Sequence, residues 1–502
     1  MKYESTQQAV EALKKLQELM AAYNHVLNVT YLDAVTAAPR GSYEGRSKTM
    51  GVMSQVTYDL IASKDNGVLL QALEADIENL DLQTRREVEQ LRKQYDQIHR
   101  IPAQEYVEYS MLLNDAQAVW ERAKNENDFA AFAPYLEKIV DFNRRFAGYY
   151  NPEMLPYDAL LNEYEEGLNM ETLDAFFAEL RTVIVPLIGK IVRAKPVDDE
   201  FLYRHYPVDK QKVFSDYLME VMGLDRNYCS IAETEHPFTI KFNNKDVRIT
   251  THYHEDALAS SMFSVIHEGG HALYELGCDD CYNTSFLGGG VSMGIHESQS
   301  RFYENIIGRS LAFVELIYPK LLELFPEQLD GVSAEMFYRA INKAEPSLIR
   351  IEADDLTYCM HIMVRYELEK QLIDGSLQVK DVPQAWNRLY KEYLGVTVSD
   401  DKNGCLQDSH WSGGSIGYFP SYALGSAYGA QLLYVMEQEI GSVEDLVRDG
   451  KLADITAWLR EHIHRHAGFY RPGTLFEKVC GKFDAQYYTD YLWKKYTALY
   501  QL

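Results

Sequence analysis

The sequence has few basic residues for its length and no long apolar run. It contains 49 lysines and arginines against 75 aspartates and glutamates, which gives a formal net charge of −26. A surface with this excess of negative charge repels the phosphates of nucleic acids and anionic lipid headgroups. No uninterrupted apolar segment approaches the ~20 residues that cross a bilayer, and the first residues lack the apolar core of a signal peptide. We therefore expect a cytoplasmic protein without nucleic acid or membrane partners.

Cysteine and proline are also scarce. Six cysteines in 502 residues do not form the dense framework of a small secreted protein, so we expect reduced thiols. The 15 prolines leave long stretches without a helix breaker, and apolar residues recur at three- and four-residue steps, as in Val10, Leu13, Leu16 and Met20. We find no internal repeat and no long linker. These features predict a mainly α-helical protein with a single domain over residues 1–502.

One stretch departs from the helical pattern. Residues 238–242 and 247–251 alternate in polarity and contain several β-branched and aromatic side chains. The polar residues 243–246 between them are typical of a tight turn. The sequence therefore predicts a β-hairpin at this position.

The segment after the hairpin is predicted to form one helix from Ala257 to Leu276. Asp256 is suited to cap its start, and Gly277 is suited to end it. Gly269 and Gly270 lie inside the helix, where each glycine costs about 1 kcal/mol relative to alanine. We expect this cost to be offset because another segment, or the backbone of a substrate, lies close to the glycines.

This helix carries the pattern His-Glu-x-x-His. His267 and His271 are four residues apart, so their rings lie on one face and can bind the same metal ion. Glu268 lies beside the first histidine, where a carboxylate can take a proton from a metal-bound water. The pattern is typical of zinc metallopeptidases, although it also arises by chance.

A catalytic zinc ion has three protein ligands and one open position for water. The first carboxylate suited to be the third ligand is Glu297, which follows a glycine-rich stretch after His271. A third histidine at the spacing His-x-x-Gly-x-x-His is absent, because Tyr274 and Gly277 occupy those positions. His296 is a rival, since neighbouring residues on a helix point about 100° apart and only one of the two faces the ion. Cobalt or manganese are alternatives to zinc.

Six motifs in a fixed order resemble those of the thermostable carboxypeptidase family of zinc metallocarboxypeptidases, which is distantly related to angiotensin-converting enzyme and neurolysin. They are His236-Pro237-Phe238, Asp246-Val247-Arg248-Ile249-Thr250, His267 to His271, His296-Glu297-Ser298-Gln299, Ile349-Arg350-Ile351-Glu352-Ala353-Asp354, and Gly404 to Trp411 continued by Gly417 to Tyr422. The resemblance implies a saddle-shaped helical molecule, in which two lobes flank a deep groove with a small sheet at its edge, and often a homodimer. It also implies removal of single C-terminal residues from peptide substrates of many sequences.

Carried over position by position, the resemblance assigns His267, His271 and Glu297 as the metal ligands. It assigns Glu268 as the catalytic glutamate. Asp354, in the fifth motif, is a candidate to orient a ligand histidine, and a plain salt bridge is the alternative.

Substrate recognition needs further groups. Paired N–H donors of arginine suit a free C-terminal carboxylate, which makes Arg350 the first candidate and Arg248 the second. A structural ion pair with nearby acids is the alternative for either arginine. His410 and Tyr418 are candidate donors to the oxyanion of the transition state. His236, in the first motif, is a further substrate-binding candidate.

Two other patterns favour ordinary structure over chemistry. Cys278 and Cys281 have the spacing of half a metal knuckle, but no second pair follows, and an ordinary loop is favoured. His462, His464 and His466 lie in a polar segment and favour a solvated helix face.

Two other functions stay open at this point. One is an endo-acting zinc oligopeptidase with the same chemistry, in which Arg350 only neutralises acids. The other is a helical scaffold that kept the motif without binding metal.

Overall fold

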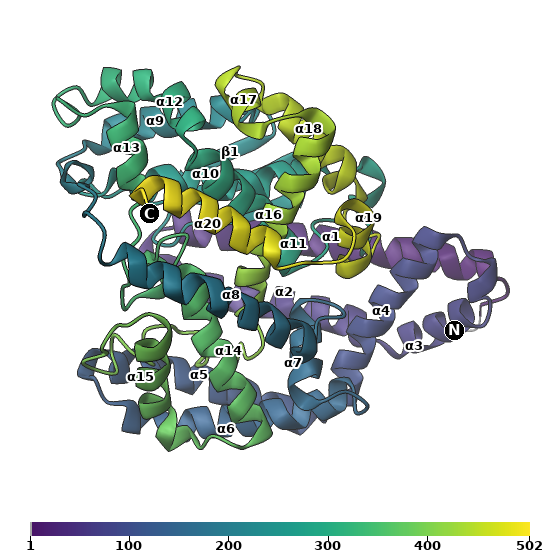
Figure 1. Ribbon diagram of the computed structural model, residues 1–502. Helices are drawn as coiled ribbons and strands as arrows, with labels where there is room; N and C mark the ends of the chain where they lie inside the picture. Colours follow the sequence, from purple (N-terminus) through teal and green to yellow (C-terminus); the bar gives the residue numbers. More distant parts are fainter. Residues whose placement is uncertain (1–2) are drawn as a thin grey trace.

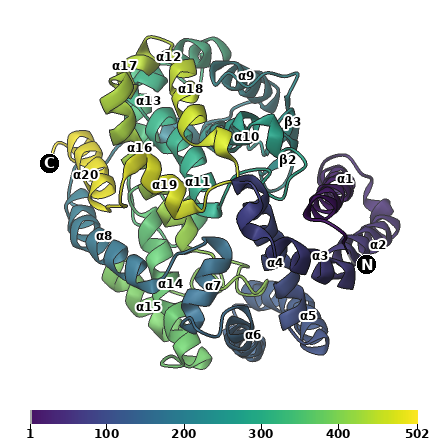
Figure 2. The same cartoon turned by 90° about the vertical axis from the view of Figure 1, so that its right-hand side faces the viewer.

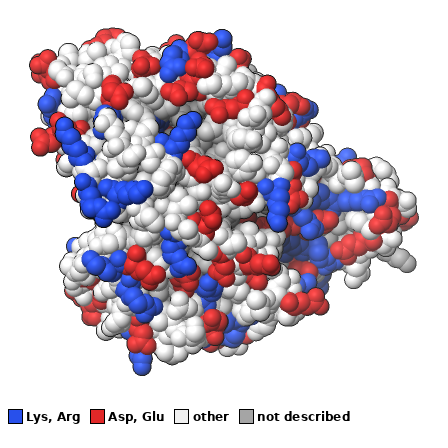
Figure 3. All heavy atoms as spheres, viewed as in Figure 1, with Lys and Arg blue, Asp and Glu red and all other residues white. Residues whose placement is uncertain are grey.

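The computed structural model describes residues 3–502, apart from the side chain of Arg40. It is mainly helical with one three-stranded sheet, as the sequence predicted (Figure 1). Lys and Arg side chains are interspersed with Asp and Glu over the face shown in Figure 3, so the excess of acid does not gather in one patch there. Among residues 3–502, no helix is both long enough and apolar enough to span a membrane.

The first nine helices precede the sheet. They are α1 (Thr6–Thr36), α2 (Tyr43–Ala62), α3 (Lys64–Glu74), α4 (Leu82–Arg100), α5 (Ala103–Glu126), α6 (Phe129–Tyr150), α7 (Pro156–Tyr164), α8 (Met170–Ile191) and α9 (Val208–Val221). Figure 2 shows α1 to α3 grouped at one side, with α4 joining them to the remainder. Leu13 and Leu16 of α1 are buried in a small core with α3 and α4, which fits the apolar spacing in the sequence.

The remaining helices form most of the main body. They are α10 (Leu258–Gly277), α11 (Met293–Arg301), α12 (Leu311–Leu324), α13 (Ala334–Ile341), α14 (Tyr358–Asp374), α15 (Val382–Tyr393), α16 (Pro420–Ile440), α17 (Val443–Arg448), α18 (Leu452–His462), α19 (Pro472–Cys480) and α20 (Gln486–Tyr500). A π-helical segment, Phe302–Gly308, continues α11. One continuous hydrophobic core runs through these elements and α5 to α9, from Ala116 to Leu499.

The sheet contains the predicted hairpin and one further strand. Strand β2 (Thr239–Asn243) pairs antiparallel with β3 (Asp246–Thr251), which confirms the hairpin. Strand β1 (Cys229–Glu233), which the sequence analysis did not predict, pairs parallel with β3, so the strand order is β1-β3-β2. Helix α10 packs against β2 and β3. The sheet therefore lies directly beside the helix that carries the metal motif.

The limits of α10 differ slightly from the prediction. The cap position is Ala257, which has no capping side chain, so Asp256 as the cap was wrong. Asp256 lies one residue too early for its carboxylate to take the place of a cap. The helix ends at Gly277, as the sequence suggested.

Candidate metal centre

The structure brings together the three residues predicted as metal ligands. His267 and His271 project from α10 and Glu297 from α11, and one ligand atom of each lies within 4.8 Å of the others. Glu297 Oε2 is 3.8 Å from His267 Nε2 and 3.7 Å from His271 Nε2. Two imidazole nitrogens and one carboxylate oxygen at such separations fit the donor set of a catalytic divalent metal. Within residues 3–502 this is the one group of at least three His, Cys, Asp or Glu residues with this geometry.

Glycines allow the helices of the centre to approach closely. A Cβ on Gly270 would lie 2.8 Å from the backbone oxygen of Gln299 in α11, and a Cβ on Gly425 in α16 would lie 2.6 Å from Glu297 Cβ. A Cβ on Gly269 would instead meet side chains at the end of α9. The segments that occupy the room left by the glycines are thus parts of this chain. Contact between α10 and α11 is what places Glu297 opposite the histidines.

Each candidate ligand histidine is oriented by its second nitrogen. His267 Nδ1 is 2.8 Å from Glu304 Oε2, and His271 Nδ1 is 2.6 Å from His296 Nδ1. His296 Nε2 is in turn 2.9 Å from Glu275 Oε1. A donating Nδ1–H leaves the Nε2 lone pair free for a metal ion. His296, the rival ligand, therefore lies behind His271 and outside the group of three.

Charges around the centre are closely paired. Arg301 Nε donates to Glu297 Oε1 at 2.8 Å, and its Nη1 donates to Glu304 Oε2 at 3.1 Å. Burial opposes ionisation of Glu304, but Arg301 and His267 hold its pKa below the usual range. Burial, together with the neighbouring His296 and His267, lowers the pKa of His271 well below that of free histidine. A neutral His271 keeps a lone pair available for a metal.

Glu268 lies next to the centre and is 7% exposed. Thr239 of β2 donates a hydrogen bond from its hydroxyl to Glu268 Oε2 at 2.6 Å. Burial is the main cause that raises the pKa of Glu268, while His267 and Thr239 act in the opposite direction. A carboxyl group with a raised pKa takes up a proton more readily than a free carboxylate, which suits a group that accepts and returns a proton.

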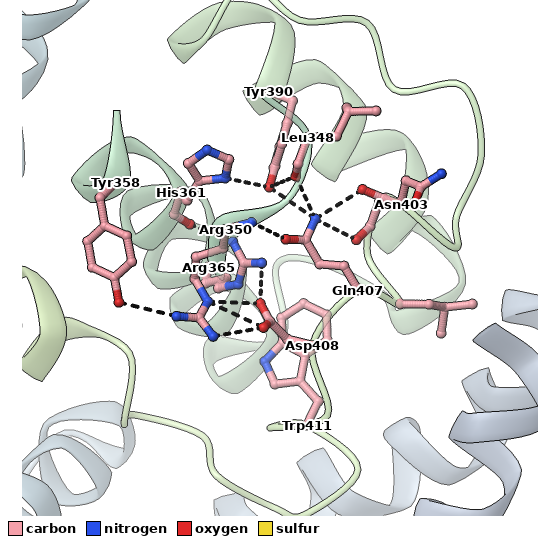
Figure 4. Close-up of polar contacts among 12 residues, drawn as sticks. Leu348, Arg350, Tyr358, His361, Arg365, Tyr390, Asn403, Gln407, Asp408 and Trp411 are labelled. Atoms are coloured by element: carbon pink, nitrogen blue, oxygen red, sulfur yellow. Dashed lines mark hydrogen bonds and ion pairs between the residues drawn. The ribbon is translucent and has the colours of Figure 1, made fainter. Parts of the chain in front are cut away.

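Arg350 takes part in a buried network, drawn in Figure 4. Its Nη2 donates to Asp408 Oδ1 at 2.9 Å, and Arg365 pairs with the other oxygen of Asp408. Its Nη1 donates to the hydroxyl of Tyr358 at 3.2 Å, and its backbone N–H donates to Gln407 Oε1 at 2.9 Å. The ion pair that the sequence analysis kept as an alternative is therefore present, whereas a free guanidinium is not.

Arg248 is also paired. Its Nε and Nη2 donate to the two carboxylate oxygens of Asp246 at 2.8 and 2.7 Å, and its guanidinium lies over the ring of Phe242. These contacts join residues of the hairpin to one another, and the ion-pair alternative holds here as well. His236 is exposed just before β2, and its backbone oxygen accepts from the hydroxyl of Thr234.

His410 and Tyr418 lie in the loop between α15 and α16, which consists of turns and bends. Their rings stack with centroids 5.6 Å apart. Burial lowers the pKa of His410 to about 4, and burial also raises the pKa of Tyr418. His410 Nδ1 is buried and has no hydrogen-bond partner among residues 3–502. Tyr418 is close enough to Glu297 for the carboxylate to influence its pKa.

Other predicted positions have structural contacts. Asp354 accepts hydrogen bonds from the backbone N–H groups of Leu356 and Thr357 at the start of α14, instead of orienting a ligand histidine. The prediction of a solvated face was wrong for His464, which is fully buried, with its Nε2 2.8 Å from Gln299 Oε1. Burial lowers the pKa of His464 to about 3. Contact with α10 and α11 explains the difference, since a Cβ on Gly277 would meet the ring of His464.

The sequence analysis missed several residues that hold the centre in place. Glu304 contacts His267, and Thr239 contacts Glu268. Glu165 accepts hydrogen bonds from residues at the start of α11. Thr239 offered only its place in the hairpin before the metal helix, because alternation along a strand does not say which face packs on that helix. Glu165 and Glu304 offered none, since an acid in a helical sequence is usually solvated.

Comparison with known proteins identifies the family. The family model of carboxypeptidase Taq (M32) metallopeptidases matches residues 12–496. This chain belongs to the M32 family. Carboxypeptidase 1 of Bacillus subtilis is 40% identical over 97% of this chain and 98% of its own length. Thermostable carboxypeptidase 1 of Thermus thermophilus is 37% identical over 93% of this chain and 94% of its own length.

Solved structures agree with this assignment to M32. The M32 carboxypeptidase from Deinococcus radiodurans R1 superposes with a TM-score of 0.95 at 35% identity, covering 99% of this chain and all (100%) of that one. Pyrococcus furiosus carboxypeptidase gives a TM-score of 0.94 at 35% identity and covers 99% of each chain. The resemblance and the fold class predicted from the sequence are thus confirmed. The protein is an M32 metallocarboxypeptidase, a hydrolase that works with a divalent metal.

Proposed function

We propose that His267, His271 and Glu297 bind one zinc ion, and that this centre removes C-terminal residues from peptides of many sequences. The observation that carries the proposal is the group of three ligand atoms within 4.8 Å of one another, with Glu268 beside it. Imidazole and carboxylate donors suit zinc, and cobalt or manganese are the alternatives. When bound, a zinc ion polarises the scissile carbonyl and lowers the pKa of a water molecule towards about 7.

The side chains around the centre have separate roles, one in proton transfer and the others in stabilising the negative charge of the oxyanion. Glu268 takes the proton of the attacking water and passes it to the leaving amine. The Thr239 hydroxyl holds the Glu268 carboxylate in place through its 2.6 Å hydrogen bond. His410 and Tyr418 donate hydrogen bonds to the oxyanion that develops on the scissile carbonyl.

Arg350 is our candidate for the substrate carboxylate. A guanidinium carries five N–H donors, and the contacts to Asp408 and Tyr358 leave donor capacity on Nη1. Its charge influences the pKa of both His410 and Tyr418, which puts it in electrostatic range of the proposed oxyanion donors. Arg248 is the weaker candidate, because its paired donors are directed at Asp246.

His236 is a further substrate-binding candidate near the hairpin strand that contacts Glu268. Its side chain is exposed, and it lies three residues before Thr239, which contacts Glu268.

The deciding experiment is mass spectrometry of peptide digests with the wild type and Glu268→Gln. We expect stepwise shortening from the C-terminus by the wild type. Loss of the general base should reduce the rate by about 10²- to 10⁴-fold while zinc stays bound. Equal rates for the two proteins would contradict the assignment of Glu268.

A peptide with an amidated C-terminus tests the carboxylate specificity. The wild type should leave it intact, and internal cuts in it would instead indicate an endo-acting oligopeptidase. Metal analysis of the purified protein tests the scaffold alternative, because a scaffold would carry no stoichiometric zinc and would lose no stability with a chelator.

We also propose a single domain over residues 1–502, a cytoplasmic location and a homodimer. The continuous core from Ala116 to Leu499 supports one domain over that part of the chain, and Phe286 packs against the small core of α1, α3 and α4 and so joins it to the main body. The six free cysteines and the net charge of −26 support the location. The homodimer rests on the resemblance to the family. Light scattering after gel filtration tests it, and a mass near 57.8 kDa would contradict it.

A further inference from the structure

Glu369 is a buried acid that the proposed reaction does not use. It lies on α14 and is 0% exposed. Its Oε1 accepts a hydrogen bond from the indole Nε1–H of Trp411 at 2.8 Å. Its Oε2 accepts from the backbone N–H of Gly417 at 2.8 Å and from the hydroxyl of Tyr157 at 2.9 Å. Burying a carboxyl group is costly, so three directed donors on one buried acid call for an explanation.

Two of these donors flank the proposed oxyanion donors. Trp411 directly follows His410, and Gly417 directly precedes Tyr418. Oε1 of Glu369 accepts the hydrogen bond from Trp411, and Oε2 accepts the one from Gly417. The single carboxylate thus joins the two ends of the segment 411–417 and sets how far apart they lie.

This segment has no regular structure of its own to fix that distance. It consists of turns and bends, and Gly414 and Gly417 adopt positive φ angles of 77° and 93°. Its other anchors are Asp408 just before it, which pairs with Arg350 and Arg365 (Figure 4), and Ser412 near its start, whose hydroxyl donates to Gln117 Oε1 at 2.7 Å. Both of these contacts are made near His410, so the carboxylate of Glu369 is the contact common to both ends.

We propose that Glu369 is a positioning residue for the hydrolysis reaction, which holds His410 and Tyr418 in the geometry needed to donate to the oxyanion. This inference rests on the proposed function of those two residues. Their stacked rings, 5.6 Å apart, are the arrangement that Glu369 maintains. Oxyanion donors act only when fixed before the reaction, and displacement of a reacting group by about 1 Å can cost about 10²-fold in rate.

The alternative is that Glu369 only stabilises the core. Tyr157 offers a matched control, because its hydroxyl binds the same Oε2 atom but belongs to α7, outside the loop. Tyr157→Phe removes one hydrogen bond from the carboxylate and leaves both loop contacts. Glu369→Gln keeps the shape of the side chain but replaces one acceptor oxygen with a donor, so at least one loop contact is lost.

The test compares kcat, KM and zinc content for Glu369→Gln, Tyr157→Phe and the wild type. We expect kcat to fall about 10- to 100-fold in Glu369→Gln, with KM and zinc content unchanged. Tyr157→Phe should keep kcat within about twofold of the wild type, because the hydrogen bond that this variant loses does not involve the loop. Wild-type kcat in Glu369→Gln, or equal losses in both variants, would overturn the inference.

Three further measurements separate the possible outcomes. If Glu369→Gln does not fold, Trp411→Phe removes one loop donor, and wild-type kcat in this variant would overturn the inference. Hydrogen exchange of the Trp411 indole N–H and of the Gly417 backbone N–H should be slow in the wild type and in Tyr157→Phe, and at least one of the two should be fast in Glu369→Gln. If His410→Ala and Tyr418→Phe keep full kcat, the proposed function of the donors fails. If they lose it while Glu369→Gln does not, only the positioning fails.

Discussion

The metal centre and the α15–α16 loop are positioned in different ways. His267 and His271 lie on one face of α10 because helical geometry places residues four apart together, whatever the distant surroundings. His410 and Tyr418 lie in turns and bends, where no repeat sets the direction of a side chain. The comparison teaches that the ligand pair is fixed largely by local structure, whereas the loop residues depend on partners far away in the sequence.

A buried acid nevertheless anchors each region. Glu165 accepts from the backbone N–H of Gly294 at 2.8 Å and from the Ser292 hydroxyl at 2.9 Å, which holds the start of α11. Glu369 holds Trp411 and Gly417 in the loop. Burial raises the pKa of each acid to about 7. Helix α11 also has its own hydrogen-bonded turns, so we expect the loop to depend more strongly on its acid.

The largest expected effect tests the locally fixed region. His271→Ala removes one of three proposed ligands, so we expect the purified protein to lose stoichiometric zinc and its activity to fall to background. Metal analysis and peptide digestion measure the two losses. His462→Ala is the matched control, because the ring of His462 at the end of α18 stacks on Trp458 and faces Glu439, so this variant should keep both zinc and activity. Full zinc occupancy in His271→Ala would contradict the proposed ligand set.

The next effect tests the loop. Tyr418→Phe removes one hydroxyl donor from the oxyanion, and loss of such a donor lowers kcat by about 10²- to 10³-fold. Zinc content should stay at the wild-type level, which separates this loss from that of a ligand variant. A Tyr418→Phe protein with the kcat of the wild type would show that the hydroxyl takes no part in the reaction.

The same contrast explains what the sequence could predict. The helix of the metal motif, the hairpin before it and the mainly helical fold follow from patterns only a few residues long, and each is confirmed. Glu297 was selected by its residue type and its place after a glycine-rich stretch, and the structure places it beside both histidines. The close approach of α11 that makes this contact depends on Gly270 and Gly425, which are far apart in sequence.

Residues whose surroundings form by long-range packing were predicted poorly. His464 was expected on a solvated face, but packing against Gln299 buries it completely. Strand β1 was missed because its one partner among residues 3–502, β3, follows it after the hairpin turn and pairs in parallel. Glu369 offered no signal, because all three of its donors are distant in sequence. Trp411 and Gly417 lie 42 and 48 residues after it, and Tyr157 lies far before it in α7.

The smallest expected effect concerns the residue that sequence alone could not separate from the ligands. His296→Gln removes the ring that faces His271 Nδ1, so we expect zinc affinity to fall by about 10- to 100-fold, as for other residues that orient a ligand histidine. Competition with a chelator measures this affinity, and activity at saturating zinc should largely recover. Failure to bind zinc at any concentration would instead indicate that His296 is a ligand. Such a result would require the group around His271 to rearrange when metal binds.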